Sequence, residues 1–392
     1  MTKRIYLHVG APATGGRFLR RALWGNRRRL GDNGVCYPFG GPQEHFGATM
    51  DLREMSWGGR RDPAWDGAWN RMVERVHDWG GPTVVLTEPL LAGASEEQAR
   101  RAVASLEPAE VHIVFSTRAL GWQLLADWQE QIRHGHAITF DRFTDDLVAN
   151  GDKAAPPFGG LFWGLHDAPR ALGPWARAAG ADRVHVITLP APGARPGVLW
   201  SRYCALTGID PALCDVGGLD EDAPLTTVEA ELLRRLNERI GPMLGGDYER
   251  VVGEYLLKGG LAAAADQVGR HPMTLPERHQ DWARREGARV AEAIRAADYD
   301  VVGDLEELGE LRLPAAGRLP DQVPEALVST ASVGVVAHLL ERLTQSHERI
   351  GLAHLNSQLT GVRENLDRLL EAAGESAPAL QRATRRVGRR TP

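Results

Sequence analysis

The chain has 392 residues, of which 43% are hydrophobic and 25% charged, the composition of an ordinary globular protein with one large or two modest domains. Its 46 basic and 51 acidic residues give a formal net charge of −5, which argues against a protein that coats nucleic acid, because that task needs a basic surface. Three scattered cysteines argue against a disulfide framework or a zinc ribbon. Since neither a signal peptide nor a run of about 18 uninterrupted apolar residues is evident, we expect a cytoplasmic protein without a membrane span.

Four short apolar runs rich in β-branched residues predict buried strands. They cover residues 5–9, 83–87, 111–117 and 184–189. The segments between them carry apolar residues at helical spacing, so strands alternate with helices. This alternation predicts an α/β fold in three layers, with helices on both faces of a mainly parallel sheet.

Beyond about residue 220 the strand signals fade, and helical spacing predominates. We expect helices over residues 229–240, 248–257 and 282–296. Residues 299–304 form either a late edge strand or the closing segment of the core. The α/β domain is therefore predicted to span residues 1–312.

The C-terminal part of the chain divides into three predicted segments. Residues 313–325 are rich in proline and glycine and resemble a linker, residues 326–374 are helical, and residues 375–392 carry five arginines in a basic, disordered tail. Five residues of the helical segment are spaced for one buried stripe, namely Val333, Val336, Leu339, Leu340 and Leu343. A second apolar run over residues 352–370 could pack against the core or against a second subunit, which would make the protein a homo-oligomer.

The most informative segment is the loop between the first strand and the first helix. The strand is predicted to end at Gly10 and the helix to begin near Thr14, while residues 1–31 carry eight basic side chains and no acidic one. Such a loop can surround an anion with backbone N–H groups, and the helix N-terminus adds a positive dipole end. The candidate anion-binding residues are Ala11, Pro12, Ala13, Thr14, Gly15, Gly16 and Arg17. A plain strand–turn–helix corner would have a similar sequence.

A nucleotide triphosphatase loop would need a lysine and a hydroxyl residue after its second glycine. Gly10 and Gly15 have the required spacing, but Gly16 and Arg17 follow them. Neither the lysine that contacts the phosphates nor the hydroxyl that holds Mg²⁺ is present. The sequence therefore disfavours ATP- or GTP-dependent phosphoryl transfer.

The loop and several later segments resemble one known family. The residues concerned are His8-Val9-Gly10-Ala11-Pro12-Ala13-Thr14-Gly15-Gly16-Arg17, Asn33-Gly34-Val35-Cys36-Tyr37-Pro38, Ser116-Thr117-Arg118 and Leu206-Thr207-Gly208-Ile209-Asp210-Pro211. In this order they resemble the sulfotransferase family, especially its actinobacterial branch, whose N-terminus reads roughly H-x-G-A-P-K-T-G-T-T. The resemblance covers about residues 1–310.

The resemblance implies a P-loop-like fold that transfers a sulfuryl group from 3′-phosphoadenosine 5′-phosphosulfate to a hydroxyl or amine, without a metal. The acceptor would be a small molecule or a glycan. In that scheme the first loop binds the 5′-phosphosulfate, and an arginine at the end of a later strand binds the 3′-phosphate. Arg118 stands at this position, and its forked donors suit a phosphate. A salt bridge to a nearby carboxylate is the alternative for Arg118.

The sequence departs from the family pattern in the loop and after Arg118. Ala13 stands where the family has its lysine, Gly16 and Arg17 stand where it has paired threonines, and Ala126 replaces a serine. Loss of one preorganised donor to a developing charge typically lowers the rate by about 10²–10³. Either Arg17 supplies a substitute cation, or activity is weak or absent.

Glu88 is the candidate general base, because it directly follows a predicted parallel strand, at the end where ligands bind. A helix-capping or salt-bridged glutamate is the alternative. His45 could line the acceptor pocket, whereas His8 lies inside a predicted strand and is expected to be structural. No residues have the spacing of a zinc site, so no metal is expected.

Two functional hypotheses follow from these residues. The first is a sulfotransferase-like enzyme in which Glu88, Arg17 and His45 serve catalysis. The second is a catalytically impaired protein of the same fold that acts as a nucleotide-binding or protein-interaction module, with residues 326–373 as docking helices. The retained Arg118 and Glu88 favour the enzyme, and Ala13 and Ala126 favour the module.

Overall fold

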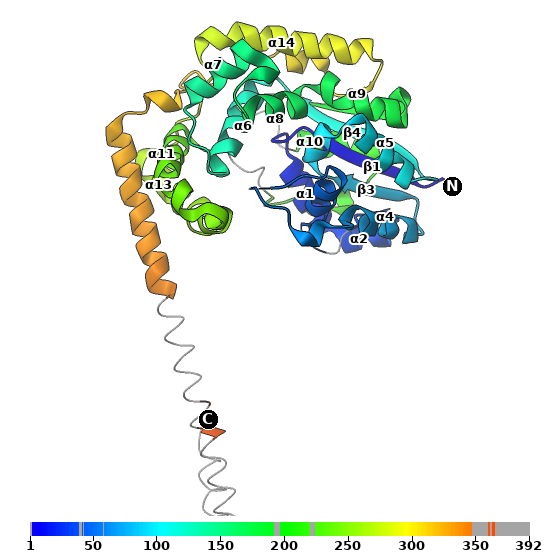
Figure 1. The fold of residues 1–392 in the computed structure, drawn as a ribbon, viewed down its shortest axis with the longest axis horizontal. Helices are drawn as coiled ribbons and strands as arrows, with labels where there is room; N and C mark the ends of the chain where they lie inside the picture. Colours follow the sequence, from blue (N-terminus) through cyan, green and yellow to red (C-terminus); the bar gives the residue numbers. More distant parts are fainter. Residues whose placement is uncertain are drawn as a thin grey trace, which may run out of the picture.

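The computed structural model describes residues 2–38, 41, 43–57, 59–191, 197–219, 224–346, 360 and 363–364. Its centre is a six-stranded parallel sheet with the strand order β2-β3-β1-β4-β5-β6 (Figure 1). The strands are β1 (Arg4–Gly10), β2 (Val35–Cys36), β3 (Thr83–Thr87), β4 (Glu110–Arg118), β5 (Val184–Leu189) and β6 (Asp300–Val302). The predicted α/β class is confirmed, and so is the late edge strand, β6. The two-residue β2 was not predicted.

Helices precede and follow these strands along most of the chain. They are α1 (Gly16–Gly25), α2 (Arg27–Asp32), α3 (Glu44–Leu52), α4 (Ala68–Asp78), α5 (Glu96–Ser105), α6 (Leu120–Arg133), α7 (Phe140–Asn150), α8 (Phe158–His166), α9 (Ala168–Ala179), α10 (Val198–Thr207), α11 (Thr227–Leu244), α12 (Tyr248–Val252), α13 (Gly260–Val268) and α14 (Glu277–Ala296). The C-terminal helix is Glu325–Ser346. A capping box of Thr226 and Glu229 starts α11 two residues earlier than the apolar spacing indicated.

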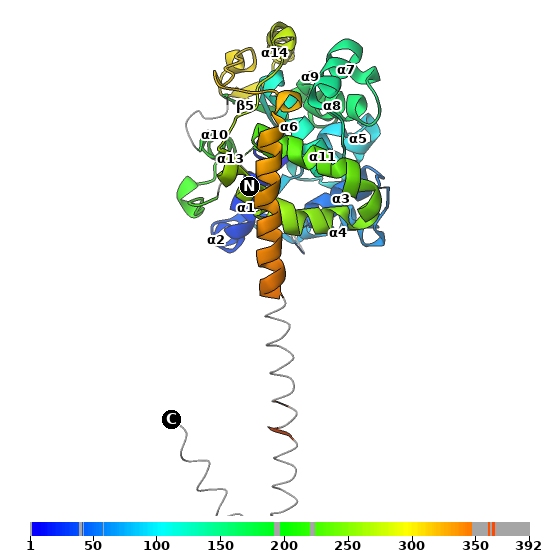
Figure 2. The same ribbon diagram turned by 90° about the vertical axis from the view of Figure 1, so that its left-hand side faces the viewer.

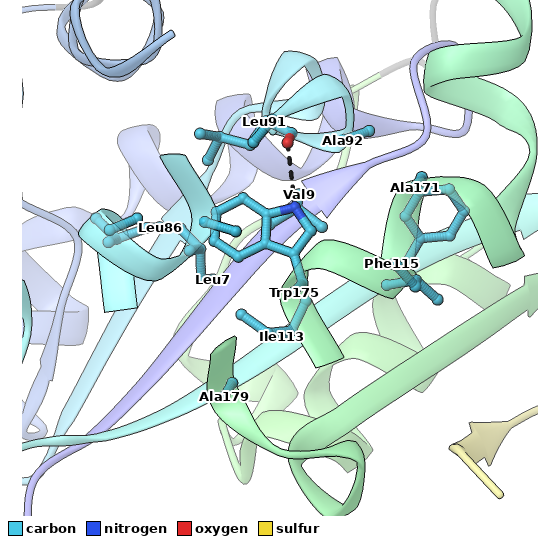
Figure 3. Close-up of a cluster of buried hydrophobic side chains, with 14 of the residues drawn as sticks. Leu7, Val9, Leu86, Leu91, Ala92, Ile113, Phe115, Ala171, Trp175 and Ala179 are labelled. Atoms are coloured by element: carbon cyan, nitrogen blue, oxygen red, sulfur yellow. Dashed lines mark hydrogen bonds between the residues drawn. The ribbon is translucent and has the colours of Figure 1, made fainter. Parts of the chain in front are cut away.

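Side chains of the strands alternate between the two faces of the sheet, and each face has its own hydrophobic core. On the first face, Ile5, Leu7 and Val9 of β1 are fully buried beneath α3, α4, α5, α9 and α14. Figure 3 shows this core around Trp175 of α9, whose indole N–H donates to the carbonyl oxygen of Leu91 at 3.2 Å. The second face is covered by α1, α2 and α10.

A third hydrophobic core is helical and lies beyond the sheet. It joins α6, α7, α11 and α13 to the start of the C-terminal helix. Asp321 fixes the preceding segment to this core, because its carboxylate accepts from the backbone N–H groups of Phe140 and Asp141 at 3.2 and 2.5 Å. Residues 313–325 are therefore hydrogen-bonded and packed, with Leu313 and Leu319 partly buried against the same core.

The prediction of a buried stripe on the C-terminal helix is wrong. Val333, Val336, Leu340 and Leu343 are 69%, 54%, 58% and 52% exposed, and only Leu339 of the predicted five packs against the helical core. A different set of residues from this helix enters the core, namely Val328, Ala331 and Val335. The predicted apolar run over residues 352–370, apart from Thr360, Arg363 and Glu364, and the basic tail lie outside the described residues.

By length and composition, the C-terminal helix is also apolar enough to cross a membrane. Its most apolar window has a mean hydropathy of 1.3, and 22% of that window is buried in the fold. Polar residues interrupt the helix, so it contains no run of about 18 uninterrupted apolar residues.

Candidate functional site

The candidate residues of the sequence analysis meet at one edge of the sheet. The strands β3, β1 and β4 are parallel neighbours, so their carboxyl ends lie side by side. The loop of residues 11–15 leaves β1, Glu88 follows β3, and Arg118 ends β4. Ligands of open parallel sheets bind at this edge, where strand order changes direction.

Hydrogen bonds to β4 hold the loop in place. The N–H of Ala11 donates to the carbonyl of Ser116 at 2.7 Å. The hydroxyl of Thr14 donates to the carbonyl of Ala11 at 2.6 Å and lies 2.6 Å from the hydroxyl of Ser116. Thr14 and Ser116 are both buried, so these bonds are shielded from water. The loop is therefore fixed in shape by its own strand neighbours.

His8 extends this polar chain beneath the loop. Its Nδ1 lies 2.8 Å from the Thr87 hydroxyl, and its Nε2 lies 2.9 Å from the Ser116 hydroxyl. Burial lowers the pKa of His8 to about 4. The imidazole thus links β1 to both neighbouring strands as a neutral group, which agrees with the structural role expected for it. In the sequence, this network could have been recognised from the three polar residues His8, Thr87 and Ser116, each of which lies inside a predicted apolar strand.

The first helix begins at Gly16, two residues after the predicted start. Its N-cap is Gly15, with φ of 86°, and within the described residues no side chain caps the helix and no acid lies in its first turn. The first N–H groups of such a helix lack partners within the helix and favour an anion. This end of α1 has the chemistry of an anion site.

The last residue of the loop, Gly15, and the first residue of α1, Gly16, permit close packing that larger residues would prevent. A Cβ at Gly15 would lie 2.3 Å from Cδ2 of Leu199, and one at Gly16 would lie 2.8 Å from Cγ of Pro89. Pro89 therefore fills the space that a side chain at position 16 would need. This contact gives a physical reason for Gly16.

Arg118 reaches from the end of β4 to the loop. Its Nη2 donates to the carbonyl oxygen of Ala13, a residue whose φ is 56°. The guanidinium therefore lies beside Ala13, in the middle of the loop. The structure thus brings Arg118 and the loop together.

Arg17 is paired with an acid across the site. Its Nη2 lies 2.5 Å from Oε1 of Glu130 on α6, and the Arg17 side chain is 46% exposed. Arg133 binds the same oxygen of Glu130 at 3.2 Å. One carboxylate thus faces two arginines, so part of the positive charge of Arg17 is neutralised.

Glu88 is buried at the same edge and has a cationic neighbour. Its Oε2 lies 3.6 Å from Nη1 of Arg20 on α1, and its Oε1 accepts from the N–H of Leu90 at 3.4 Å. Burial raises the pKa of Glu88, while Arg20 and the bond from Leu90 oppose the rise. The capping and salt-bridge alternatives for Glu88 are thus both present in the structure. Arg20, the cationic partner of Glu88, was not singled out as a site residue in the sequence.

His45 lies close to Glu88 but is bound by the backbone. Its Nε2 lies 2.5 Å from the carbonyl oxygen of Pro38, and its Nδ1 lies 3.4 Å from the backbone nitrogen of Thr87. Burial lowers the pKa of His45 to about 4. The ring is therefore neutral near pH 7, with both nitrogens engaged.

Two hollows of the described structure lie away from this edge. One has a volume of about 400 Å³ and is lined by residues 25–29. The other has a volume of about 720 Å³ and lies along α7. Within the described ranges no group of three or more His, Cys, Asp or Glu residues is placed to hold a metal ion.

The fold and the site define an α/β protein whose first loop and helix form a candidate anion site. No protein-family model matches the sequence, and no curated protein matches it. Among solved structures, the chain is similar to a sulfotransferase from Alicyclobacillus acidocaldarius, with 17% identity over 62% of this chain and 96% of that chain and a TM-score of 0.38. This likeness is too distant to indicate the chemistry of the chain.

Proposed function

We propose that the chain is a sulfotransferase-like protein that binds 3′-phosphoadenosine 5′-phosphosulfate at the carboxyl edge of its sheet and transfers the sulfuryl group to a hydroxyl or amine. The observation that carries this proposal is the contact between Arg118 and the carbonyl of Ala13. It brings a forked cation beside a loop that leads into an uncapped helix end. Guanidinium donors and helix N-termini both favour phosphate and sulfate groups.

The residues of the edge fit such a nucleotide in part. The first turn of α1 and Arg118 offer N–H donors for two anionic groups, as binding requires. Ala13 offers no cation where sulfate would leave, and Arg17 is the nearest substitute in the sequence. Binding is therefore better supported by the site than rapid transfer.

Glu88 is proposed to accept the proton of the acceptor. As the acceptor oxygen forms its bond to sulfur, the bond between sulfur and the bridging phosphate oxygen breaks, and adenosine 3′,5′-bisphosphate leaves. Burial of Glu88 raises its pKa and so makes its ionised form a stronger base, while Arg20 at 3.6 Å favours that ionised form. A positioned base contributes about 10²–10⁴ to the rate.

One observation favours the second hypothesis, a nucleotide-binding or protein-interaction module without transfer. The ion pair between Arg17 and Glu130 reduces the positive charge that Arg17 could give to the leaving group. In that case the fold keeps a nucleotide site and has lost most of its chemistry.

Transfer is tested with ³⁵S-labelled donor and a panel of phenols, alcohols and amines. We expect labelled product from the wild-type chain, a decrease of about 10²–10⁴ in Glu88→Gln, and a decrease of about 10²–10³ in Arg17→Ala. Arg28→Ala, an exposed change on α2, is the matched control and should retain the wild-type rate. Nucleotide binding without any product would favour the module, and failure of both would reject the two hypotheses together.

A further inference from the structure

The C-terminal helix Glu325–Ser346 is fixed to the body of the protein along one face. Val328, Ala331 and Val335 are buried in the helical core. At Gly334 the helix approaches α13 so closely that a Cβ would lie 2.7 Å from the carbonyl oxygen of Ala263. Farther along, Nη2 of Arg342 lies 2.7 Å from a carboxylate oxygen of Glu254. The orientation of the helix is thus determined by its own chain.

A second face of the same helix carries large apolar side chains and no cover from the described residues. Four of the seven most exposed large hydrophobic residues of the described structure lie there, namely Val333, Val336, Leu340 and Leu343. At 100° per residue this stripe lies about 130° around the helix from the buried face. Figures 1 and 2 both show the end of the helix, drawn in orange, projecting beyond the body of the fold.

The spacing of the exposed stripe is that of a coiled-coil seam. Val333, Val336, Leu340 and Leu343 follow one another at intervals of three, four and three positions, which places them at alternating a and d positions. The sequence returns to this spacing over three further heptads, in a run that comprises Leu352, Leu355, Leu359, Val362, Leu366 and Leu369. Eight residues, with Gly351 among them, lie between Leu343 and Leu352, so the register changes between the two runs. Apolar a and d positions over several heptads are typical of helices that pair with one another.

We propose that this stripe is a self-association surface, on which the C-terminal helix of one copy packs against the same helix of a second copy. The surface is isologous, because each copy offers the same stripe to the other, and the resulting dimer is closed. Because the other face of each helix is packed against its own chain, the α/β body of each copy would lie at the start of its paired helix. This proposal is independent of the nucleotide chemistry, since the stripe and the loop lie on different elements.

The composition of the helix favours a protein partner over a lipid surface. Helices that lie in a membrane interface carry a wide apolar face with Lys and Arg residues along the polar face. Here the exposed stripe is narrow, and Arg342 is the sole Lys or Arg residue of Glu325–Ser346. Its side chain is occupied by Glu254. A strict two-residue-per-heptad stripe is instead the pattern of a coiled coil.

The mass of the full-length chain in solution tests the proposal, by light scattering after size-exclusion chromatography at several protein concentrations. We expect twice the 42.8 kDa of a single chain. The double variant Val336→Glu and Leu340→Glu places charges in the seam and should be monomeric. The matched control, Thr330→Glu and Gln345→Glu, adds the same charge at exposed positions off the stripe and should remain dimeric.

Circular dichroism shows whether the double variant keeps the helical content of the wild type. Because Val336 and Leu340 are exposed, we expect the variant to stay folded while it loses pairing. A monomeric wild-type chain would overturn the proposal, as would a seam variant that stays dimeric. Sedimentation with anionic lipid vesicles tests whether the stripe binds a membrane surface instead. A monomer that binds vesicles through the stripe would overturn the proposal in favour of a membrane surface.

Discussion

Acidification should destabilise this protein through two buried histidines at the candidate site. His8 and His45 have pKa values lowered to about 4 by burial, against about 6.5 in the unfolded chain. Below pH 6.5 the unfolded state therefore binds protons that the folded state does not. Stability contributed by the neutral rings is complete above pH 6.5 and is lost as the pH falls from about 6.5 toward 4.

The size of this effect follows from the two pKa values. At pH 5 an unfolded histidine is almost fully protonated while His8 and His45 are almost fully neutral, so each favours unfolding by about 2 kcal/mol. Together they remove about 4 kcal/mol between pH 7 and pH 5, a large part of the roughly 5–15 kcal/mol that stabilises a typical domain.

Urea unfolding at pH 7 and pH 5 measures this loss. The double variant His8→Gln and His45→Gln carries amides that do not titrate, so its stability should fall by about 4 kcal/mol less than that of the wild type over the same interval. His77→Gln, at an exposed position on α4, should behave as the wild type. An equal fall in the wild type and in the double variant would refute the assignment of acid sensitivity to these two rings.

Three further changes probe the loop. Arg118→Ala should weaken binding of adenosine 3′,5′-bisphosphate by about 10- to 150-fold in calorimetry, since a charge-assisted bond contributes about 1.5–3 kcal/mol, and unchanged affinity would contradict its assignment. Gly15→Ala should cost about 1–3 kcal/mol in urea unfolding, because Gly15 has a φ of 86° and an added Cβ would also meet Leu199, whereas Gly25→Ala has open space and should cost nothing. Thr14→Val should cost about 1–3 kcal/mol by the same assay, through loss of its buried hydrogen bond to the carbonyl of Ala11.

The strands of the sheet could be predicted because each is apolar on both faces. Residues 83–87 and 184–189 were predicted with the bounds that β3 and β5 have, and β1 and β4 each extend one residue beyond their predictions at both ends. The short strand β2 escaped prediction because two residues, Val35 and Cys36, are too few to show a period. Its pairing with β3 is a tertiary contact that no local pattern encodes.

The candidate site could be predicted as a location but not as a set of contacts. Parallel strands bring their carboxyl ends together, and this rule placed Glu88 at the edge from which the loop leaves, whereas Arg118 was singled out through the resemblance to the sulfotransferase family. The partners of these groups come from distant segments, as with Glu130 for Arg17 and Arg20 for Glu88. Spacing also revealed an apolar stripe on the C-terminal helix without showing which face would meet the core. The face that meets the helical core carries Val328, Ala331 and Val335.

Binding of adenosine 3′,5′-bisphosphate, followed by thermal unfolding, tests the central claim about the loop and Arg118 most directly. At about 100 times its dissociation constant the bisphosphate should add about 2.7 kcal/mol to the free energy of unfolding. Adenosine 5′-monophosphate, which lacks the 3′-phosphate, should give a much smaller increase at the same concentration. No increase with the bisphosphate at millimolar concentration, or equal increases with both nucleotides, would contradict the account.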